Sequence, residues 1–151
     1  TECSAINLAE FAIMGDILAR HALGIEKPRV ALLNIGAEEM KGKEEIHQAA
    51  HMIKNSKMHL NFRGYIEPHE IPNGVADVII SDGFTGNIAL KSIEGTAKLV
   101  VRLIKDSIKH SFLAKLGLPF MLSVMLRIKK TMDPRLYNGA NPFAVLAKLK
   151  K

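Results

Sequence analysis

The chain has 151 residues, of which 48% are hydrophobic and 24% charged, and its formal net charge is +6. This length and apolar content suit one domain with a sizeable core and exclude a disordered chain. A single cysteine excludes an internal disulfide and a multi-cysteine metal site and fits a reducing compartment, and an aromatic content of 5% argues against a platform for stacked bases or sugars. We expect neither a metal nor a cofactor.

The charge is distributed unevenly along the chain. Residues 1–94 carry a net charge of −4, whereas residues 95–151 carry +10. A basic C-terminal third indicates an acidic partner, such as nucleic acid, an anionic membrane or an acidic protein, unless it is only a solvated helix face. Nucleic acid is disfavoured because the basic residues lack interleaved aromatic side chains and form no recognised reader motif.

Apolar periodicity predicts alternating helices and strands over the first 110 residues. Helices are expected at 5–23, 43–56 and 88–110, and strands at 29–36, 58–66 and 75–81. Ser4 is the expected N-cap of the first helix and Gly24 its end. The strand at 29–36 is almost wholly apolar, which is typical of a strand buried on both faces. This alternation predicts an α/β fold with parallel strands and right-handed crossovers.

The last third of the chain has a different character. Its apolar stretch at 116–126 contains Pro119 and falls well short of the about 20 residues that a membrane-spanning helix needs. With the basic residues that follow, it could rest on an anionic lipid surface, or it could be a core or dimer-interface helix. The side chains expected at the lipid are Leu118, Phe120, Met121, Leu122, Met125, Lys129 and Lys130. We therefore divide the domain into an α/β part, 1–111, and a helical, basic and apolar segment, 112–151.

Two polar, glycine-containing loops follow predicted strands and lead into predicted helices. The first contains Asn34, Gly36, Lys41 and Gly42, and the second contains Asp82, Gly83, Thr85, Gly86 and Asn87. Ligands bind at this edge of open α/β sheets, and helix N-termini there favour phosphate-like anions. The glycine spacing matches neither the P-loop nor the dinucleotide-binding fingerprint.

Each loop can be interpreted either as part of a ligand site or as an ordinary turn between a strand and a helix. Lys41 could hold an anion as a point charge, or it could be an exposed lysine beside a turn glycine. The Thr85 hydroxyl and nearby backbone N–H groups could cradle a phosphate while Asn87 donates to an oxygen, or either residue could simply cap the next helix. Asp82 could bind a ligand, orient it or merely cap the helix, and a turn role explains it better than ligand binding does.

The histidines and the cysteine carry weaker signals. His47 and His51 have the i, i+4 spacing of zinc-binding pairs, but Gln48 stands where a zinc protease needs glutamate. A surface helix face explains them better. Cys3 has no histidine near it in the sequence, which favours a buried or idle thiol.

The sequence resembles the bacterial phosphate:acyl-acyl-carrier-protein acyltransferases of phospholipid synthesis. The motifs that carry the resemblance are Leu-Leu-Asn-Ile-Gly at 32–36, Lys-Gly at 41–42 and Ser-Asp-Gly-Phe-Thr-Gly-Asn at 81–87. Further matches at 7–15, 24–30, 61–64, 76–78 and 90–95 extend it over nearly the whole chain, in order and without forced gaps.

The resemblance implies a Rossmann-like αβα sandwich, similar to that of isocitrate dehydrogenase and phosphotransacetylase. It implies transfer of a long acyl chain from acyl carrier protein to inorganic phosphate, with Lys41 and Asn87 at the family's catalytic positions. From their places in the two loops, we expect the phosphate site to be lined by Asn34, Gly36, Gly42, Asp82, Gly83, Thr85 and Gly86. Family members are cytoplasmic homodimers attached peripherally to the membrane, where a glycerol-3-phosphate acyltransferase receives the acyl-phosphate.

Departures from the family pattern point to a partial domain. The family's other half, with its own glycine-rich motif, is missing before Thr1, and its closing glycine-rich segment does not follow 138–140. We therefore expect a fragment or truncated product that lacks the sheet strands and the part of the cleft that the other half should supply. The alternatives are a short-chain phosphate acetyl- or butyryltransferase of the same fold group and a non-catalytic membrane-surface module.

Overall fold

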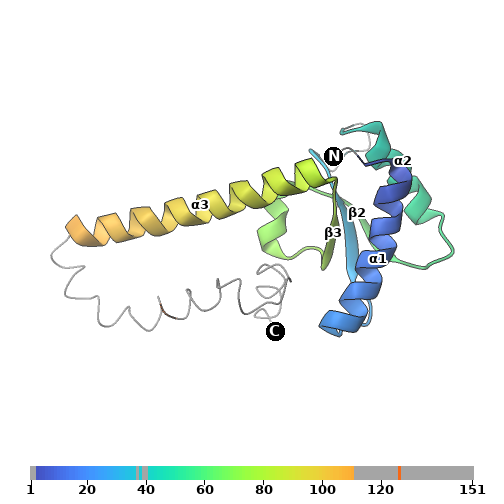
Figure 1. The fold of residues 1–151 in the computed structure, drawn as a ribbon, viewed down its shortest axis with the longest axis horizontal. Helices are drawn as coiled ribbons and strands as arrows, with labels where there is room; N and C mark the ends of the chain where they lie inside the picture. Colours follow the sequence, from blue (N-terminus) through green and yellow to red (C-terminus); the bar gives the residue numbers. More distant parts are fainter. Residues whose placement is uncertain (1–2, 37, 39–40, 111–125, 127–151) are drawn as a thin grey trace. The chain divides into compact units, whose positions relative to one another are not determined.

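The computed structural model describes residues 3–36, 38, 41–110 and 126. Its elements are, in chain order, α1 (Ala5–Leu23), β1 (Arg29–Leu33), α2 (Glu44–Lys54), β2 (Asn61–Ile66), the 3-10 helix η1 (Pro68–Asn73), β3 (Val78–Ile80) and α3 (Gly83–His110) (Figure 1). The chain divides into two compact units, residues 1–89 and 90–151. The first unit contains the sheet and both glycine-containing loops.

The three strands form one parallel sheet in the order β2-β1-β3. Helices α1 and α2 pack beside each other on one face, and the crossover from β2 to β3, which includes η1, runs on the other (Figure 1). An extra residue in β2 shifts the register, because Val30 lies opposite Phe62 but Leu32 lies opposite Tyr65. The predicted α/β fold with parallel strands is confirmed, and the arrangement is compatible with part of a Rossmann-like domain.

Helix α1 begins and ends where the sequence predicts. The Ser4 side chain accepts the Asn7 N–H at 3.3 Å, and the Asn7 side chain accepts the Ser4 N–H at 3.2 Å, which makes a reciprocal capping box. Gly24 ends the helix in the left-handed conformation at a φ of 66°. Local chemistry is therefore sufficient to define this helix.

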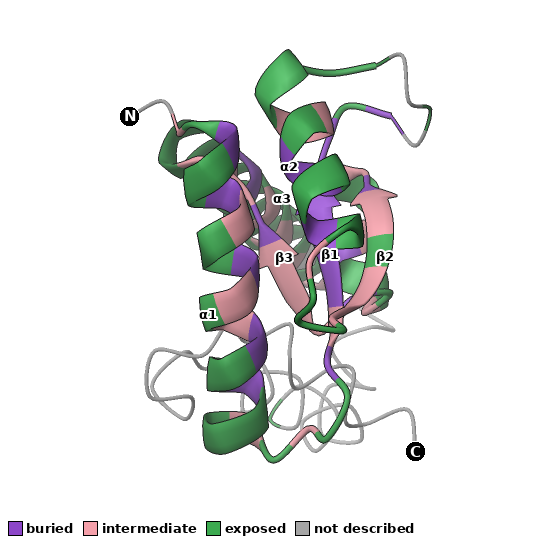
Figure 2. Cartoon of the chain, turned by 90° about the vertical axis from the view of Figure 1, so that its right-hand side faces the viewer, coloured by how far each residue is buried: buried purple, intermediate pink, exposed green. Residues whose placement is uncertain are grey.

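Strand β1 forms the centre of the core, as predicted for a strand buried on both faces. Val30, Ala31, Leu32 and Leu33 expose at most 2% of their surface (Figure 2). The start of the strand is held by Arg29, whose guanidinium makes two hydrogen bonds to the Asp77 carboxylate at 2.8 and 2.9 Å. These bonds, together with the Arg29 N–H, lower the pKa of Asp77 despite its burial.

The predicted ends of the other elements need correction. All three strands are shorter than predicted, because residues 34–36, 58–60, 75–77 and 81 do not join the sheet ladder. The prediction of a turn at 82–87 followed by a helix from 88 is wrong. Helix α3 begins at Gly83, since Asp82 accepts the backbone N–H of Thr85 at 2.7 Å and so satisfies a first-turn donor.

The basic and apolar segment at 112–151 lies outside the described residues, except for residue 126. Leu118, Phe120, Met121, Leu122, Met125, Lys129 and Lys130 are therefore not placed. Among the described residues, no helix combines the length and the apolar character needed to cross a bilayer.

Candidate active site

The two loops follow neighbouring strands and lie at the same edge of the sheet. β1 and β3 are parallel and hydrogen-bonded to each other, with Leu32 opposite Ile80. The loop after β1 leads into α2, and Ser81 and Asp82 lead from β3 directly into α3. The sheet thus brings two helix N-termini to its carboxyl edge, as the sequence predicted.

Asn34 organises the first loop from inside. It is 3% exposed, its Nδ2 donates to the Lys41 carbonyl at 2.7 Å, and its Oδ1 accepts the Ile35 N–H at 2.9 Å. Gly42 packs so closely against this carboxamide that a Cβ would overlap it, and its φ is 105°. Asn34 and Gly42 therefore fix the backbone that carries Lys41.

Lys41 projects to the surface of this loop. Its ammonium lies 2.9 Å from Glu38 Oε1, and this hydrogen bond raises the pKa of Lys41 above its usual value. Gly36 is buried beneath the lysine, since a Cβ there would lie 2.5 Å from Lys41 Cδ. The arrangement presents a protonated amine at the loop surface.

The second loop is organised by Asp82. Its Oδ1 accepts the Thr85 N–H, and its Oδ2 accepts the Thr85 hydroxyl at 2.8 Å. Gly86 donates its N–H to the Asp82 carbonyl at 2.9 Å and approaches Ser81 closely. The Thr85 donors that the sequence assigned to phosphate thus bind Asp82, and Asp82 rather than Thr85 or Asn87 caps the helix.

Asn87 belongs to the first turns of α3 and is exposed to solvent. Gly83 is the first residue of that helix and is also exposed. Because the Thr85 N–H is already bound to Asp82, the group that this turn presents to solvent is the Asn87 carboxamide.

A contact that the sequence analysis missed joins the two loops. Lys43, the N-cap residue of α2, places its ammonium 4.0 Å from Asp82 Oδ2. Burial favours protonation of Asp82, but the hydrogen bonds from Thr85 and the charge of Lys43 outweigh it and lower the Asp82 pKa. The available signal was a lysine just before the helix that follows β1 and an aspartate just after β3, once the order of the strands is known.

The histidines and the cysteine that the sequence singled out contact other parts of the structure. His47 contacts the Tyr65 hydroxyl at 3.1 Å, and His51 contacts the side chain of Asn55 at the same distance. Within the described part of the chain, no cluster of His, Cys, Asp and Glu side chains is arranged to hold a metal ion. Cys3 is a half-buried free thiol packed against the core.

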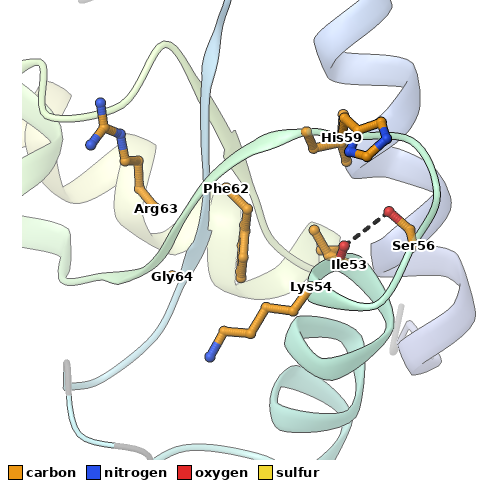
Figure 3. A pocket seen from close by; sticks show the side chains of 8 residues that line it. Ile53, Lys54, Ser56, His59, Phe62, Arg63 and Gly64 are labelled. Carbon is orange, nitrogen blue, oxygen red and sulfur yellow. Dashed lines mark hydrogen bonds between the residues drawn. The ribbon is translucent and has the colours of Figure 1, made fainter.

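A pocket of about 460 Å³ lies away from the two loops, between the end of α2 and the start of β2. Lys54, His59 and Arg63 contribute to its lining. Figure 3 shows that these side chains point in different directions, with Arg63 on the opposite side of the strand from Phe62. Because its basic side chains do not converge, this pocket is a poorer candidate than the loop edge.

Comparison with known proteins identifies the family. A model of the family described as fatty acid synthesis protein matches residues 1–148. A phosphate acyltransferase of Paramagnetospirillum magneticum is 45% identical over 139 residues, which are 92% of this chain and 40% of that protein. Those of Rhodospirillum centenum and Granulibacter bethesdensis are 48% and 47% identical, over 92% and 91% of this chain and 39% and 38% of their own lengths.

These relatives cover almost all of this chain, and the chain spans about two-fifths of their length. The resemblance of the loop motifs thus agrees with an overall similarity far above chance. The chain belongs to the fatty acid synthesis protein family, an acyltransferase family whose members include the phosphate acyltransferases of lipid synthesis.

Proposed function

We propose that this chain is the part of a phosphate acyltransferase that carries its catalytic lysine and asparagine. The reaction moves a long-chain acyl group from acyl carrier protein to inorganic phosphate and yields acyl-phosphate. The observation that carries the proposal is the position of the Lys41 loop and of the first turns of α3, which contain Asn87, at one edge of the sheet, in a chain similar to phosphate acyltransferases over nine-tenths of its length.

In the proposed step, a phosphate oxygen attacks the thioester carbonyl. The new C–O bond gives a tetrahedral oxyanion, which collapses with cleavage of the C–S bond and release of the carrier thiolate, which takes up the proton that the phosphate loses. Lys41 holds the anionic phosphate, and the Asn87 carboxamide donates to the developing oxyanion. Phosphate is itself the nucleophile, so the protein needs no activated serine or cysteine.

The first prediction concerns these two residues. We expect Asn87→Ala to lower kcat about 100- to 1,000-fold, since one oxyanion donor contributes roughly 3–4 kcal/mol elsewhere, and Lys41→Ala to lower kcat/KM for phosphate. Both variants should keep the wild-type unfolding midpoint, because both side chains are exposed. The measurement is acyl-phosphate formation by the 151-residue chain and by a chimaera in which this segment replaces its counterpart in a full-length relative.

Lys27→Ala is the matched control, because Lys27 is exposed and precedes β1 at the other edge of the sheet. Wild-type rates from both the Lys41→Ala and the Asn87→Ala variants would contradict the proposal.

A second experiment tests the choice of substrate. Palmitoyl carrier protein and acetyl-coenzyme A, tested side by side, distinguish a long-chain enzyme from a short-chain one. We expect the carrier-bound substrate to be preferred.

The proposal includes a peripheral site on the cytoplasmic face of the membrane, from which acyl-phosphate passes to a membrane glycerol-3-phosphate acyltransferase. Its support is the apolar stretch at 116–126 within a C-terminal third of charge +10. The second prediction is that Phe120→Glu with Leu122→Glu abolishes flotation with anionic liposomes. Undiminished flotation would reject membrane attachment through this segment.

We also propose that the protein assembles as a homodimer.

A further inference from the structure

The contact between the two loops points to an additional residue of the proposed phosphate site. Lys43 is the N-cap residue of α2, and its ammonium has only donors, so it cannot accept the first-turn N–H groups of that helix. Its ammonium lies instead near Asp82, on the loop that follows the neighbouring strand. A cation from the α2 side is therefore held beside the N-terminus of α3.

The two lysines of this edge are held differently. Lys41 makes a short contact to Glu38, at 2.9 Å, whereas Lys43 lies 4.0 Å from the Asp82 carboxylate. Both Asp82 oxygens already accept hydrogen bonds from Thr85. The Lys43 side chain is 58% exposed, and an ammonium has three donors, so it can bind a second anion while it remains beside Asp82.

The carboxylates around Lys41 explain why phosphate would need a second cation at this edge. Among the described residues, Lys41 pairs with Glu38 and also feels the charge of Glu67, Lys43 lies near Asp82, and Glu44 and Glu45 add negative charge in the first turn of α2. Phosphate near neutral pH carries between one and two negative charges, so one lysine that is already paired with glutamate neutralises it poorly. A second cation that Asp82 holds only at long range supplies the missing attraction.

We propose that Lys43 binds a phosphate oxygen and that Asp82 positions it by holding it between the two loops. This inference rests on the proposed function, because it names a further residue of the same phosphate site. Lys43 acts on phosphate affinity, whereas Asn87 acts on the acyl-transfer step.

The direct test measures binding of inorganic phosphate to the 151-residue chain by phosphorus NMR titration. We expect Lys43→Gln to weaken binding about tenfold, which corresponds to about 1.4 kcal/mol, and Lys43→Arg to restore most of it. Lys27→Gln, which removes the same charge at the other sheet edge, should bind as the wild type does. The unfolding midpoint of Lys43→Gln should shift only slightly, because the contact with Asp82 is 4.0 Å long and exposed on the lysine side, and a small shift separates a binding role from a structural one.

The kinetic test uses the active wild-type protein or chimaera. Lys43→Gln should raise the KM for phosphate with little change in kcat or in the KM for the acyl donor. Unchanged phosphate binding in Lys43→Gln, with binding weakened in Lys41→Ala, would overturn the role of Lys43 and leave the proposed function standing. A wild-type chain and chimaera that neither bind phosphate nor form acyl-phosphate would overturn the proposed function, and this inference with it.

Discussion

The buried carboxamide of Asn34 links the end of β1 to the start of α2. Its two polar atoms are hydrogen-bonded to backbone groups of Ile35 and Lys41, so the loop is closed around it. A hydrogen-bonded polar group in this position costs little, whereas an unsatisfied one would be expensive. The residue therefore determines the path of the backbone on which Lys41 is displayed.

The third prediction follows from the packing of Gly42 on Asn34. Gly42→Ala introduces a Cβ that overlaps the Asn34 carboxamide, at a φ of 105° where a side chain is strained. We expect a loss of roughly 2–4 kcal/mol, since strain of about 1–3 kcal/mol adds to the steric clash. The measurement is the free energy of unfolding in urea.

Gly24→Ala provides the matched control for this prediction. Gly24 also has a positive φ, of 66°, but nothing lies within 4 Å of the position where its Cβ would stand. That substitution should cost only about 1 kcal/mol from the left-handed backbone. Equal losses at the two glycines would show that the Asn34 contact does not constrain the loop.

At the scale of elements, the sequence predicts best what local chemistry decides. Helix α1 is reproduced at both ends because Ser4, Asn7 and Gly24 act on residues of their own helix. The strands are shorter than their apolar runs because ladder pairing depends on how far the neighbouring strand extends. The start of α3 was missed because Gly83 and Gly86 suggested a turn, while the capping carboxylate of Asp82 outweighed the low helix propensity of glycine.

The sequence likewise predicts one part of the candidate site and not the rest. The two loops and their shared edge follow from alternating strands and helices, and Lys41 and Asn87 follow from the family motifs. The ion pair of Lys43 with Asp82 depends on β1 and β3 being neighbours, which the order β2-β1-β3 establishes only in three dimensions. The inward role of Asn34 likewise depends on the folded path of its loop.

The fourth prediction concerns the cap of α3. Asp82→Ala should destabilise the chain by about 1–2 kcal/mol at pH 7, because a first-turn N–H loses its acceptor. The folded-state pKa of Asp82 lies below its ordinary value of 3.8, so its ionised form stabilises the fold above that pH. This contribution is lost as the pH falls through the lowered pKa.

The difference between wild type and Asp82→Ala should therefore narrow as the pH falls below about 4. Urea unfolding followed by circular dichroism at several pH values measures this difference. Asp77 also has a lowered pKa, but it is present in both proteins, so its contribution cancels. A difference that stays constant down to pH 2.5 would contradict the charged cap.

At the scale of the whole molecule, the first unit exposes apolar surface on the outer side of α1. The face of this helix that packs on the sheet contains small or aliphatic residues such as Leu8 and Ala12. On the other side, Met14 and Leu18 expose 63% and 65% of their surface, with Ile6 and Ile17 also exposed (Figure 2). A helix that is apolar on two sides is typical of one covered on both, and contiguous apolar patches mark contact surfaces.

The fifth prediction is that this surface causes self-association of the 151-residue chain. Sedimentation equilibrium should give an average mass above 16.6 kDa that rises with concentration, since burying apolar area contributes about 25 cal/mol per Å². Met14→Glu with Leu18→Glu should reduce this rise and leave the fold intact, because both side chains point away from the core. Lys57→Glu changes the net charge by the same amount at an exposed loop position, so it separates charge repulsion from loss of the apolar contact. If the control variant dissociates the chain as effectively as the α1 variant does, association depends on charge and not on this helix face.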